Sequence, residues 1–443
     1  MYSISKYSFF CINKAGDLLM YNSYVGVDSF CKIKKGSFSK DILKSKKVEY
    51  LPAEYYKALL KKGIIIDEDV NERKRLISII GQTVNPRELS LYINSTEYCN
   101  FRCKYCYESH SRGEMTKDIQ DNIIKYVKEN IRFYSGLNVE WFGGEPLLGM
   151  DCIKNLSEEF IKICKFYRRR YSASMTTNGY LLSDDVFLKL LDLNVKRYQI
   201  TIDGVQEDHD AFRVLCNGKG TFDKIYANLM KIKTLKRRDF SIQLRSNITL
   251  KNFQNIDEYL RLLEELSKGD PRINVAIFKV GNWLDKADSN ITEDIINDSN
   301  DMRRIYEAIL NSNREINLST LFLNPGSGVC YGGKSNNFLF CSDGSVHKCT
   351  VTFEEDNTSV GKLVSGKMEL NDNYYKMISD YTKCEKIFDC DSAPVCMGEP
   401  CPVADREDTV GKHCSYFKDC LDIVLQIFDK NGKVDFLKED TNG

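Results

Sequence analysis

Three cysteines lie close together at Cys99, Cys103 and Cys106, in C-x3-C-x2-C spacing. Thiolates this near in sequence can face one point only if the backbone loops around it, and soft sulfur ligands suit an iron–sulfur cluster or zinc. A [4Fe–4S] cluster bound by three cysteines keeps one iron without a protein ligand, and that iron can bind another molecule. The stretch therefore predicts a metal site that also receives a ligand.

A second group of cysteines occupies the C-terminal part of the chain, where nine of the 17 lie between Cys330 and Cys420. Clustered cysteines in a protein of a reducing compartment more often bind metal than form disulfides. Structural zinc is the alternative to an iron–sulfur cluster, because it fits sites of four cysteines. The five scattered cysteines are expected to be small buried apolar residues; they are Cys11, Cys31, Cys152, Cys164 and Cys216.

The bulk composition is that of a soluble globular protein, and 443 residues predict two or three domains. The 63 basic and 63 acidic side chains cancel, which argues against a general nucleic-acid or anionic-membrane binder, although residues 168–170 form a local basic patch. No apolar run approaches about 20 residues, and the N-terminus lacks the pattern of a signal peptide. We therefore expect a cytoplasmic protein with no nucleic-acid or membrane partner.

Strand-like and helix-like segments alternate from residue 86 to about 290. Such alternation predicts an α/β fold with parallel strands and helices outside, and six repeats make a partial, open (β/α)6 barrel. The functional loops of parallel α/β barrels follow the C-terminal ends of the strands. The predicted strands are 89–94, 138–142, 171–176, 197–203, 241–248 and 273–279, and the predicted helices are 116–134, 151–169, 183–193, 222–235 and 255–266.

Three further regions flank this core. Residues 1–85 predict a small α+β module with a hairpin and short helices; it is either a peptide-recognition module or an extension that only packs on the core. Residues 291–324 predict a polar, helical connection. Residues 325–443 predict a cysteine-rich domain of short strands, with a helix from Cys414 to about Phe428.

Two glycine-containing turns follow the second and third predicted strands. Gly143-Gly-Glu-Pro146 permits close approach of the backbone to a ligand, and its carbonyls together with the Glu145 carboxylate suit an ammonium group. Thr177-Asn-Gly179 ends the third strand. Each sequence is also typical of a simple turn, so their shared position at strand ends is what favours a site.

The fourth strand ends in Ile200-Thr-Ile-Asp-Gly204, which is followed by His209, Asp210 and Arg213. The planar guanidinium of Arg213 suits a carboxylate ligand, because it offers a fork of donors. Arg245, near the end of the fifth strand, is a weaker candidate for the same site.

These motifs together resemble the radical S-adenosylmethionine (SAM) enzymes, in particular the branch that includes the sulfatase maturases. Tyr105, the aromatic residue before the last cysteine, also fits that pattern. The resemblance implies that Cys99, Cys103 and Cys106 hold a [4Fe–4S] cluster that binds SAM. It further implies SAM contacts from Tyr105, Gly143, Gly144, Glu145, Asn178, Thr201 (where the usual Ser is replaced but its hydroxyl kept), Arg213 and Arg245.

The C-terminal cysteines resemble the SPASM domain, which holds auxiliary [4Fe–4S] clusters. Cys396-Met-Gly-Glu-Pro-Cys401-Pro has one residue more than the C-x-G-G-C-P turn of that domain, and Cys384-x5-Cys390 stands where the family has C-x2-C. By this resemblance Cys330, Cys349 and Cys401 hold a first auxiliary cluster, which Cys341 completes or which keeps an open iron. Cys384, Cys390, Cys396 and Cys414 hold a second, and Cys420 holds none.

The resemblance implies an enzyme whose 5′-deoxyadenosyl radical abstracts hydrogen from a substrate. The first expectation is a maturase of a ribosomally made precursor peptide that forms a cross-link, most often a thioether, with residues 1–85 gripping a leader segment by strand addition. The second is an anaerobic sulfatase maturase that forms formylglycine. A non-catalytic iron–sulfur electron carrier is the third, although it would need no SAM site. The expected reductant is a flavodoxin or ferredoxin.

Overall fold

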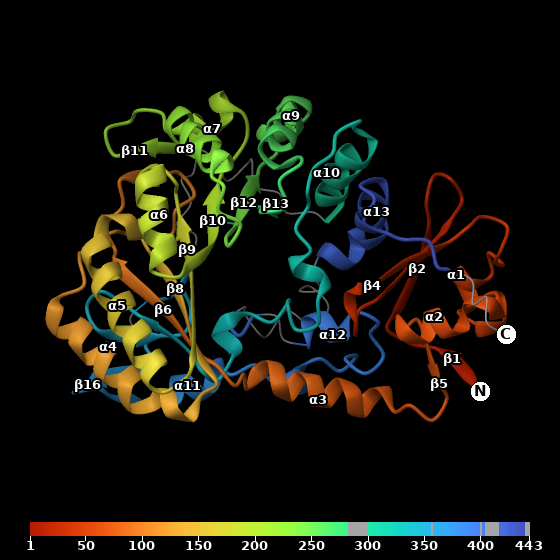
Figure 1. Ribbon diagram of the computed structural model, residues 1–443, viewed down its shortest axis with the longest axis horizontal. Coiled ribbons are helices and arrows are strands. Elements are labelled where there is room, and N and C mark those ends of the chain that lie inside the picture. Colours follow the sequence, from red (N-terminus) through yellow and green to blue (C-terminus); the bar gives the residue numbers. More distant parts are fainter. Residues whose placement is uncertain (282–298, 356–357, 399–400, 404–415, 439–443) are drawn as a thin grey trace.

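A ten-stranded sheet forms the centre of the structure (Figure 1). The computed structural model describes residues 1–281, 299–355, 358–398, 401–403 and 416–438. Parallel strands make one side of the sheet in the order β13-β12-β10-β9-β8-β6, so each strand pairs with the next along the chain, as in a barrel wall. This confirms the predicted α/β fold. The strands are β6 (Leu89–Thr96), β8 (Gly136–Gly143), β9 (Arg170–Thr177), β10 (Val195–Thr201), β12 (Ser241–Ile248) and β13 (Ile273–Lys279).

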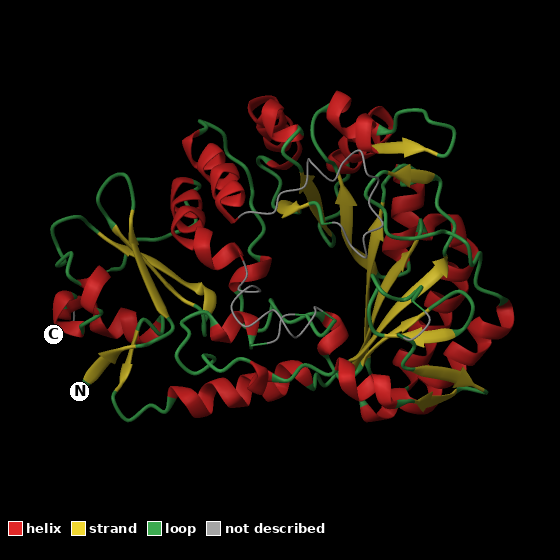
Figure 2. Ribbon diagram, turned by 180° about the vertical axis from the view of Figure 1, so that it is seen from behind, coloured by secondary structure: helices red, strands yellow, loops and turns green. Residues whose placement is uncertain are grey.

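Helices cover the outer face of these strands, as Figure 2 shows. Successive side chains of a strand point to opposite faces. Along β8, Val139 and Trp141 are fully buried in the core beneath the helices, whereas Glu140 faces the inner side. The inner face is consequently polar and suited to line a site. The helices are α4 (Lys117–Asn130), α5 (Met150–Phe166), α6 (Asp184–Asp192), α7 (Gln206–Phe212), α8 (Phe222–Thr234) and α9 (Ile256–Ser267).

The C-terminal domain continues the barrel sheet, which the sequence did not predict. Strand β14 (Asn337–Phe340) pairs parallel with β6, and three antiparallel strands extend the sheet beyond it. Pairing with β14 covers the edge that β6 would otherwise expose. The remaining elements of this domain are β15 (Ser345–His347), β16 (Gly361–Val364), β17 (Lys367–Leu370), α11 (Asp372–Met377) and α12 (Ala393–Cys396).

The N-terminal residues form a small module at the other end of the molecule (Figure 1). Its antiparallel sheet has the order β2-β3-β4, and one face of that sheet closes over a hydrophobic core that includes Leu18, Met20 and Leu59. The elements are β1 (Tyr2–Ile4), β2 (Ser8–Ile12), β3 (Leu18–Asn22), β4 (Gly26–Ile33), α1 (Ile42–Ser45), α2 (Tyr56–Lys61), β5 (Ile65–Asp67) and α3 (Glu72–Val84).

Two connections tie this module to the barrel. Helix α3 runs along the lower edge of Figure 1 from the module to β6, and Asn71 caps it by accepting the N–H of Lys74. The other face of the module sheet packs on α13 (Tyr416–Lys430), where the ring centres of Phe30 and Phe428 lie 5.5 Å apart with the rings tilted by 38°. Helix α13 in turn packs on α10 (Ser299–Asn311). Among the described helices, none has both the length and the apolar character needed to cross a membrane.

Candidate active site

The first three cysteines lie on the loop that follows β6. The short strand β7 (Phe101–Cys103) pairs antiparallel with β11 (Arg213–Leu215), which sets Cys103 opposite Arg213. The sulfur of Cys99 accepts a hydrogen bond from the backbone N–H of Phe101 at 3.4 Å. Burial raises the pKa of the Cys99 and Cys106 thiols, and neighbouring thiols of the group raise it further. The loop therefore brings the three sulfurs close enough for each thiol to affect the pKa of another.

The donor set of this loop fits an iron–sulfur cluster. No three His, Cys, Asp or Glu side chains within the described ranges converge as they would around a single metal ion. A [4Fe–4S] cluster does not require its cysteines to converge on one point, because each cysteine binds a separate iron. Hydrogen bonds to the sulfurs are among the features that set the reduction potential of such a cluster. The N–H···S bond at Cys99 is of that kind.

The glycine turn at the end of β8 packs directly on the chain that leads into the cysteine loop. Gly144 and Glu145 donate their backbone N–H groups to the carbonyl oxygens of Thr96 and Tyr98 at 3.3 and 2.9 Å. Gly143 has φ +117°, and a Cβ added there would lie 2.1 Å from the Thr96 oxygen. Only glycine permits this approach, so the turn positions the cysteine loop.

The Glu145 carboxylate, which is predicted to bind an ammonium group, is fully buried and accepts hydrogen bonds from the chain itself. One oxygen accepts from Leu147 N and Thr177 Oγ1 at 3.1 and 2.7 Å, and the other accepts from Asn178 N at 2.8 Å. Asn178 in turn donates its side-chain amide to Asn100 of the cysteine loop at 2.8 Å. Glu145 and Asn178 therefore hold two turns against the loop, and an ammonium contact stays a prediction.

Arg213 belongs to a buried polar group beside Cys103. Its guanidinium donates to the Tyr105 hydroxyl at 2.6 Å and lies 3.8 Å from the Asp203 carboxylate, to which Tyr105 also donates. The backbone N–H of Asn247, at the end of β12, donates to the same carboxylate at 2.8 Å. Burial raises the pKa of Asp203, and the Arg213 charge opposes that rise.

One donor of this group is left over. Arg213 is 7% exposed, and its Nε has no hydrogen-bond partner among the described residues. A buried donor without an acceptor is unfavourable, and a bound carboxylate would satisfy it with a charge-assisted bond. SAM carries such a carboxylate, so the residues at this position fit the cofactor that the sequence implies.

Replacing Arg213 with lysine is expected to raise the dissociation constant for SAM about tenfold or more, because lysine lacks Nε and a hydrogen bond to a charged group contributes roughly 1.5–3 kcal/mol. Equilibrium dialysis of the cluster-loaded protein measures this constant. The exposed Arg237, which pairs with Asp239 far from the loop, gives the control Arg237→Lys. An unchanged constant in Arg213→Lys would contradict the assignment.

The other predicted residues of this region lie nearby with different partners. Thr201 is buried at the end of β10, in register with Arg245 of β12. Arg245 donates to Asn247 Oδ1 at 2.8 Å and lies 4.1 Å from the ring centre of Phe278. His209 accepts the backbone N–H of Asp203, so it holds the turn that follows β10 in place. Contacts from Thr201 and Arg245 to SAM stay predictions.

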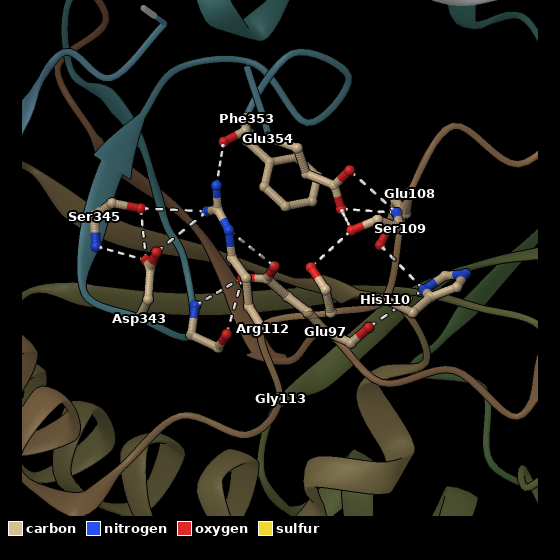
Figure 3. A network of polar contacts seen from close by, with 12 residues as sticks. Glu97, Glu108, Ser109, His110, Arg112, Gly113, Asp343, Ser345, Phe353 and Glu354 are labelled. Carbon is tan, nitrogen blue, oxygen red and sulfur yellow. Dashed lines mark hydrogen bonds and ion pairs between the residues drawn. The ribbon is translucent and has the colours of Figure 1, made fainter. Parts of the chain in front are cut away.

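A polar network joins the chain around the cysteine loop to the C-terminal domain (Figure 3). Arg112 donates to the Phe353 carbonyl at 3.0 Å and lies 3.4 and 3.8 Å from the carboxylates of Asp343 and Glu97. Glu97 is buried and also accepts from the N–H and hydroxyl of Ser342 at 3.0 and 2.9 Å. The network fixes the turn after β14 against the loop before Cys99.

The segment that follows Cys106 takes part in the same network. Ser109 donates its N–H and hydroxyl to Glu354, each at 2.8 Å (Figure 3). His110 Nε2 lies 3.7 Å from the Cys106 sulfur. Burial and two nearby carboxylates raise the pKa of Glu108 to about 8. Both flanks of the cysteine loop are therefore anchored on the cysteine-rich domain.

Cys349 and Cys401 both lie close enough to Cys330 to affect its thiol, and the three as ligands of a first auxiliary cluster stay a prediction. Burial raises the pKa of Cys330 to about 12, and the thiols of Cys401 and Cys349 contribute to the rise. The sulfur of Cys349 accepts the N–H of Val351 at 3.4 Å, which repeats the arrangement at Cys99. Cys341 is fully buried in a small apolar cluster with Leu339 and Phe353, and its role as a ligand stays a prediction.

The second predicted set is described only in part, since Cys414 lies outside the described residues. Cys384 and Cys390 pack beside one hydrophobic cluster, and the Cys390 sulfur accepts from Lys418 Nζ at 3.6 Å. Cys396 ends α12, and this set as a ligand group stays a prediction. Cys420, assigned to no cluster, is buried in the core on α13.

Aromatic side chains lie beside both cysteine groups. Tyr107 follows Cys106 directly, and its pKa is raised by burial and by the nearby charges of Glu108, Cys106 and Cys349. Tyr331, next to Cys330, stacks on Tyr92 of β6 at 4.2 Å. Two of these tyrosines, Tyr107 and Tyr331, adjoin predicted ligands in the sequence, and that adjacency is the signal by which they could have been predicted.

The structure also corrects one expectation about the scattered cysteines. Cys216 is exposed, and its thiol donates to the Cys99 carbonyl at 3.3 Å, because β11 carries it alongside the cysteine loop. The other four are buried as expected. Asp203 was missed as a functional residue, although it stands inside the quoted Ile200–Gly204 run.

Comparison with known proteins agrees with this geometry. The Radical SAM superfamily model matches residues 93–266. A cysteine-type anaerobic sulfatase-maturating enzyme of Clostridium novyi is 29% identical over 196 residues, which are 40% of this chain and 49% of that enzyme. The match therefore spans about half of that relative.

Two solved structures share the fold. Native anSMEcpe with bound AdoMet has a TM-score of 0.59 at 21% identity, covering 77% of this chain and 98% of that one. Streptococcus suis SuiB bound to the precursor peptide SuiA has a TM-score of 0.50 at 16% identity, covering 92% and 99%. Radical SAM domains use a [4Fe–4S] cluster and SAM, for which the loop and Arg213 supply fitting donors. The chain therefore carries a domain of the radical SAM superfamily across residues 93–266.

Proposed function

We propose that the chain is a radical SAM enzyme that modifies a ribosomally made precursor peptide and installs a thioether cross-link. The observation that carries this proposal is the extent of the likeness to SuiB, which covers 92% of the chain, against 77% for anSMEcpe. Agreement beyond the barrel and the cysteine-rich domain favours an enzyme that keeps a separate module for its peptide.

The inner face of the barrel supports a peptide substrate. Glu140 of β8 is partly exposed there, and its carboxylate accepts hydrogen bonds from Ser174 and, at 2.9 Å, from Thr176 of β9. An extended peptide carries a donor and an acceptor on each residue. Polar side chains on this face can exchange hydrogen bonds with such a backbone, which an apolar surface could not do.

The arrangement of the two cysteine groups supports an oxidative cross-link. When bound, the cofactors supply a 5′-deoxyadenosyl radical, which takes one hydrogen atom from a peptide C–H, and an auxiliary cluster, which accepts the remaining electron. The thiol proton leaves to solvent as the C–S bond forms, so the peptide loses two hydrogen atoms in total. The protein's part is to orient SAM through Arg213 and the Gly143–Gly144 turn, and to exclude water.

The second candidate is an anaerobic sulfatase maturase, which the C. novyi relative favours. The two candidates differ in the fate of the cysteine sulfur. Formylglycine formation removes the sulfur and leaves an aldehyde, whereas a thioether keeps the sulfur and consumes the free thiol.

The test incubates the anaerobic, cluster-loaded protein with SAM, a reductant and the peptide encoded beside its gene. We expect a product lighter by two hydrogen atoms that no longer reacts with iodoacetamide. A hydrazide-reactive product without its sulfur would replace the first proposal by the second. An unmodified peptide would contradict the thioether proposal.

A further inference from the structure

The outer edge of the N-terminal sheet carries a segment from the far end of the chain. Strand β4 is an edge strand in the order β2-β3-β4. At Lys32 its backbone N–H donates to the carbonyl of Asp435 at 2.9 Å, and its carbonyl accepts the N–H of Leu437 at 2.9 Å. The bridge between Lys32 and Phe436 is parallel. Residues 434–437, here called the C-terminal segment, therefore add to β4 as a strand adds to a sheet.

Side chains reinforce this pairing on both faces. The Lys32 ammonium lies 4.3 Å from the ring centre of Phe436, a distance at which a cation–π contact is favourable. Leu437 packs against the hydrophobic core of the module. Val434 is 5% exposed and belongs to the central core. The edge thus accepts a short sequence of acidic, aromatic and aliphatic residues, Asp435-Phe436-Leu437.

Other parts of the same sheet edge carry side-chain partners instead. The N–H of Val27 donates to Asn324 Oδ1 at 3.3 Å, and the Asp28 carbonyl accepts from Lys62 Nζ at 2.6 Å. At the opposite edge of the sheet, on β2, the Ser8 carbonyl accepts from Lys46 Nζ at 2.8 Å. The position at Lys32 differs, because there both backbone groups bond to an extended segment.

We propose that the C-terminal segment is an internal competitor, which occupies the edge of β4 at Lys32 until an extended stretch of the substrate peptide with acidic–aromatic–aliphatic character displaces it. The inference rests on the proposed function in that the partner is a peptide. Backbone pairing supplies affinity in strand addition, and the side-chain contacts supply specificity.

The short link between α13 and the C-terminal segment explains why this segment would discriminate among peptides. Helix α13 ends at Lys430, only a few residues before the segment, and a short flexible tether gives an effective concentration of about millimolar. A free peptide must outcompete the segment at that concentration. Peptides that match the edge of β4 weakly therefore fail to displace the segment, and a closely matching peptide binds in its place.

The test uses a fluorescein-labelled hexapeptide with the sequence of residues 433–438, Lys-Val-Asp-Phe-Leu-Lys, and the full-length protein. Leu437→Pro removes the N–H that bonds to Lys32, and proline is disfavoured within a paired strand. We expect fluorescence anisotropy to show binding at least about tenfold tighter in Leu437→Pro than in the natural protein, because the competing segment is released.

Lys438→Pro is the matched control, since it places the same residue one position later, where the described chain makes no backbone bond to β4. It is expected to bind the probe as the natural protein does. Phe436→Ser is the second variant, and it should also tighten probe binding, because it removes the contact with Lys32. Equal affinities in all four proteins would overturn the inference.

This assay contains neither SAM nor precursor peptide, so its outcome is separable from that of the proposed function. Tighter probe binding together with an unmodified precursor peptide would overturn the thioether proposal alone. Equal affinities together with a modified precursor would overturn the docking site alone.

Discussion

Replacing Cys103 with alanine is expected to reduce reductive SAM cleavage at least about 1,000-fold, to the background of protein without a cluster. The residue lies in the middle of the cysteine loop, directly opposite Arg213 in the β7–β11 pair. With one thiolate missing, two remain to hold a [4Fe–4S] cluster that needs three protein ligands to leave one iron for SAM. Chromatographic quantification of 5′-deoxyadenosine under anaerobic conditions measures the effect.

Cys216→Ala provides a matched control for this substitution. Cys216 lies beside the same loop and donates its thiol to the Cys99 carbonyl, yet it is exposed and outside the three-cysteine motif. It should keep most of the 5′-deoxyadenosine formation and its full iron content. Cleavage retained by Cys103→Ala, or lost equally in both variants, would contradict the assignment of the loop.

Replacing Cys349 with alanine is expected to abolish formation of the modified peptide while SAM cleavage continues. Its sulfur accepts a backbone N–H and lies near Cys330, and Tyr107 lies near both Cys349 and Cys106 of the cysteine loop. In the proposed reaction, loss of the first auxiliary cluster removes the acceptor for the second electron of the cross-link. Iron should fall from about twelve to about eight atoms per chain if three clusters are present.

The control for this prediction is Cys420→Ala, which changes a buried cysteine of α13 that belongs to no predicted cluster. Its iron content and peptide product should match those of the natural protein. Iron unchanged in Cys349→Ala would contradict the auxiliary assignment, and loss of SAM cleavage in the same variant would contradict the separation of the two cysteine groups.

Much of the barrel could be predicted, because each strand is a buried run of apolar and β-branched residues followed by an amphipathic helix. The strand 273–279 agrees to the residue, and the helix 222–235 differs by one residue. The cysteine motifs could be identified from spacing alone. Hydrophobic periodicity and cysteine spacing are local properties of the sequence, and the barrel elements and the cysteine motifs follow mainly from them.

Other features depend on contacts between distant segments and left no local signal. Strands β7 and β11 have three residues each, yet their pairing sets Arg213 opposite Cys103 and carries Cys216 to the surface beside Cys99. Glu145 is predicted to bind a ligand, and the structure adds a role that the sequence did not indicate, because its carboxylate accepts hydrogen bonds from Thr177 and Asn178. The pairing of β14 with β6 likewise joins distant segments, and no local sequence pattern indicated it.

Deuterium transfer tests the central claim most directly. The peptide is prepared with deuterium on its carbon-bound positions, incubated with the protein, SAM and a reductant, and the 5′-deoxyadenosine is analysed by mass spectrometry. We expect deuterium in 5′-deoxyadenosine in proportion to the cross-linked peptide formed, and none with Cys103→Ala. Cross-linked peptide accompanied by unlabelled 5′-deoxyadenosine would contradict hydrogen abstraction by this radical.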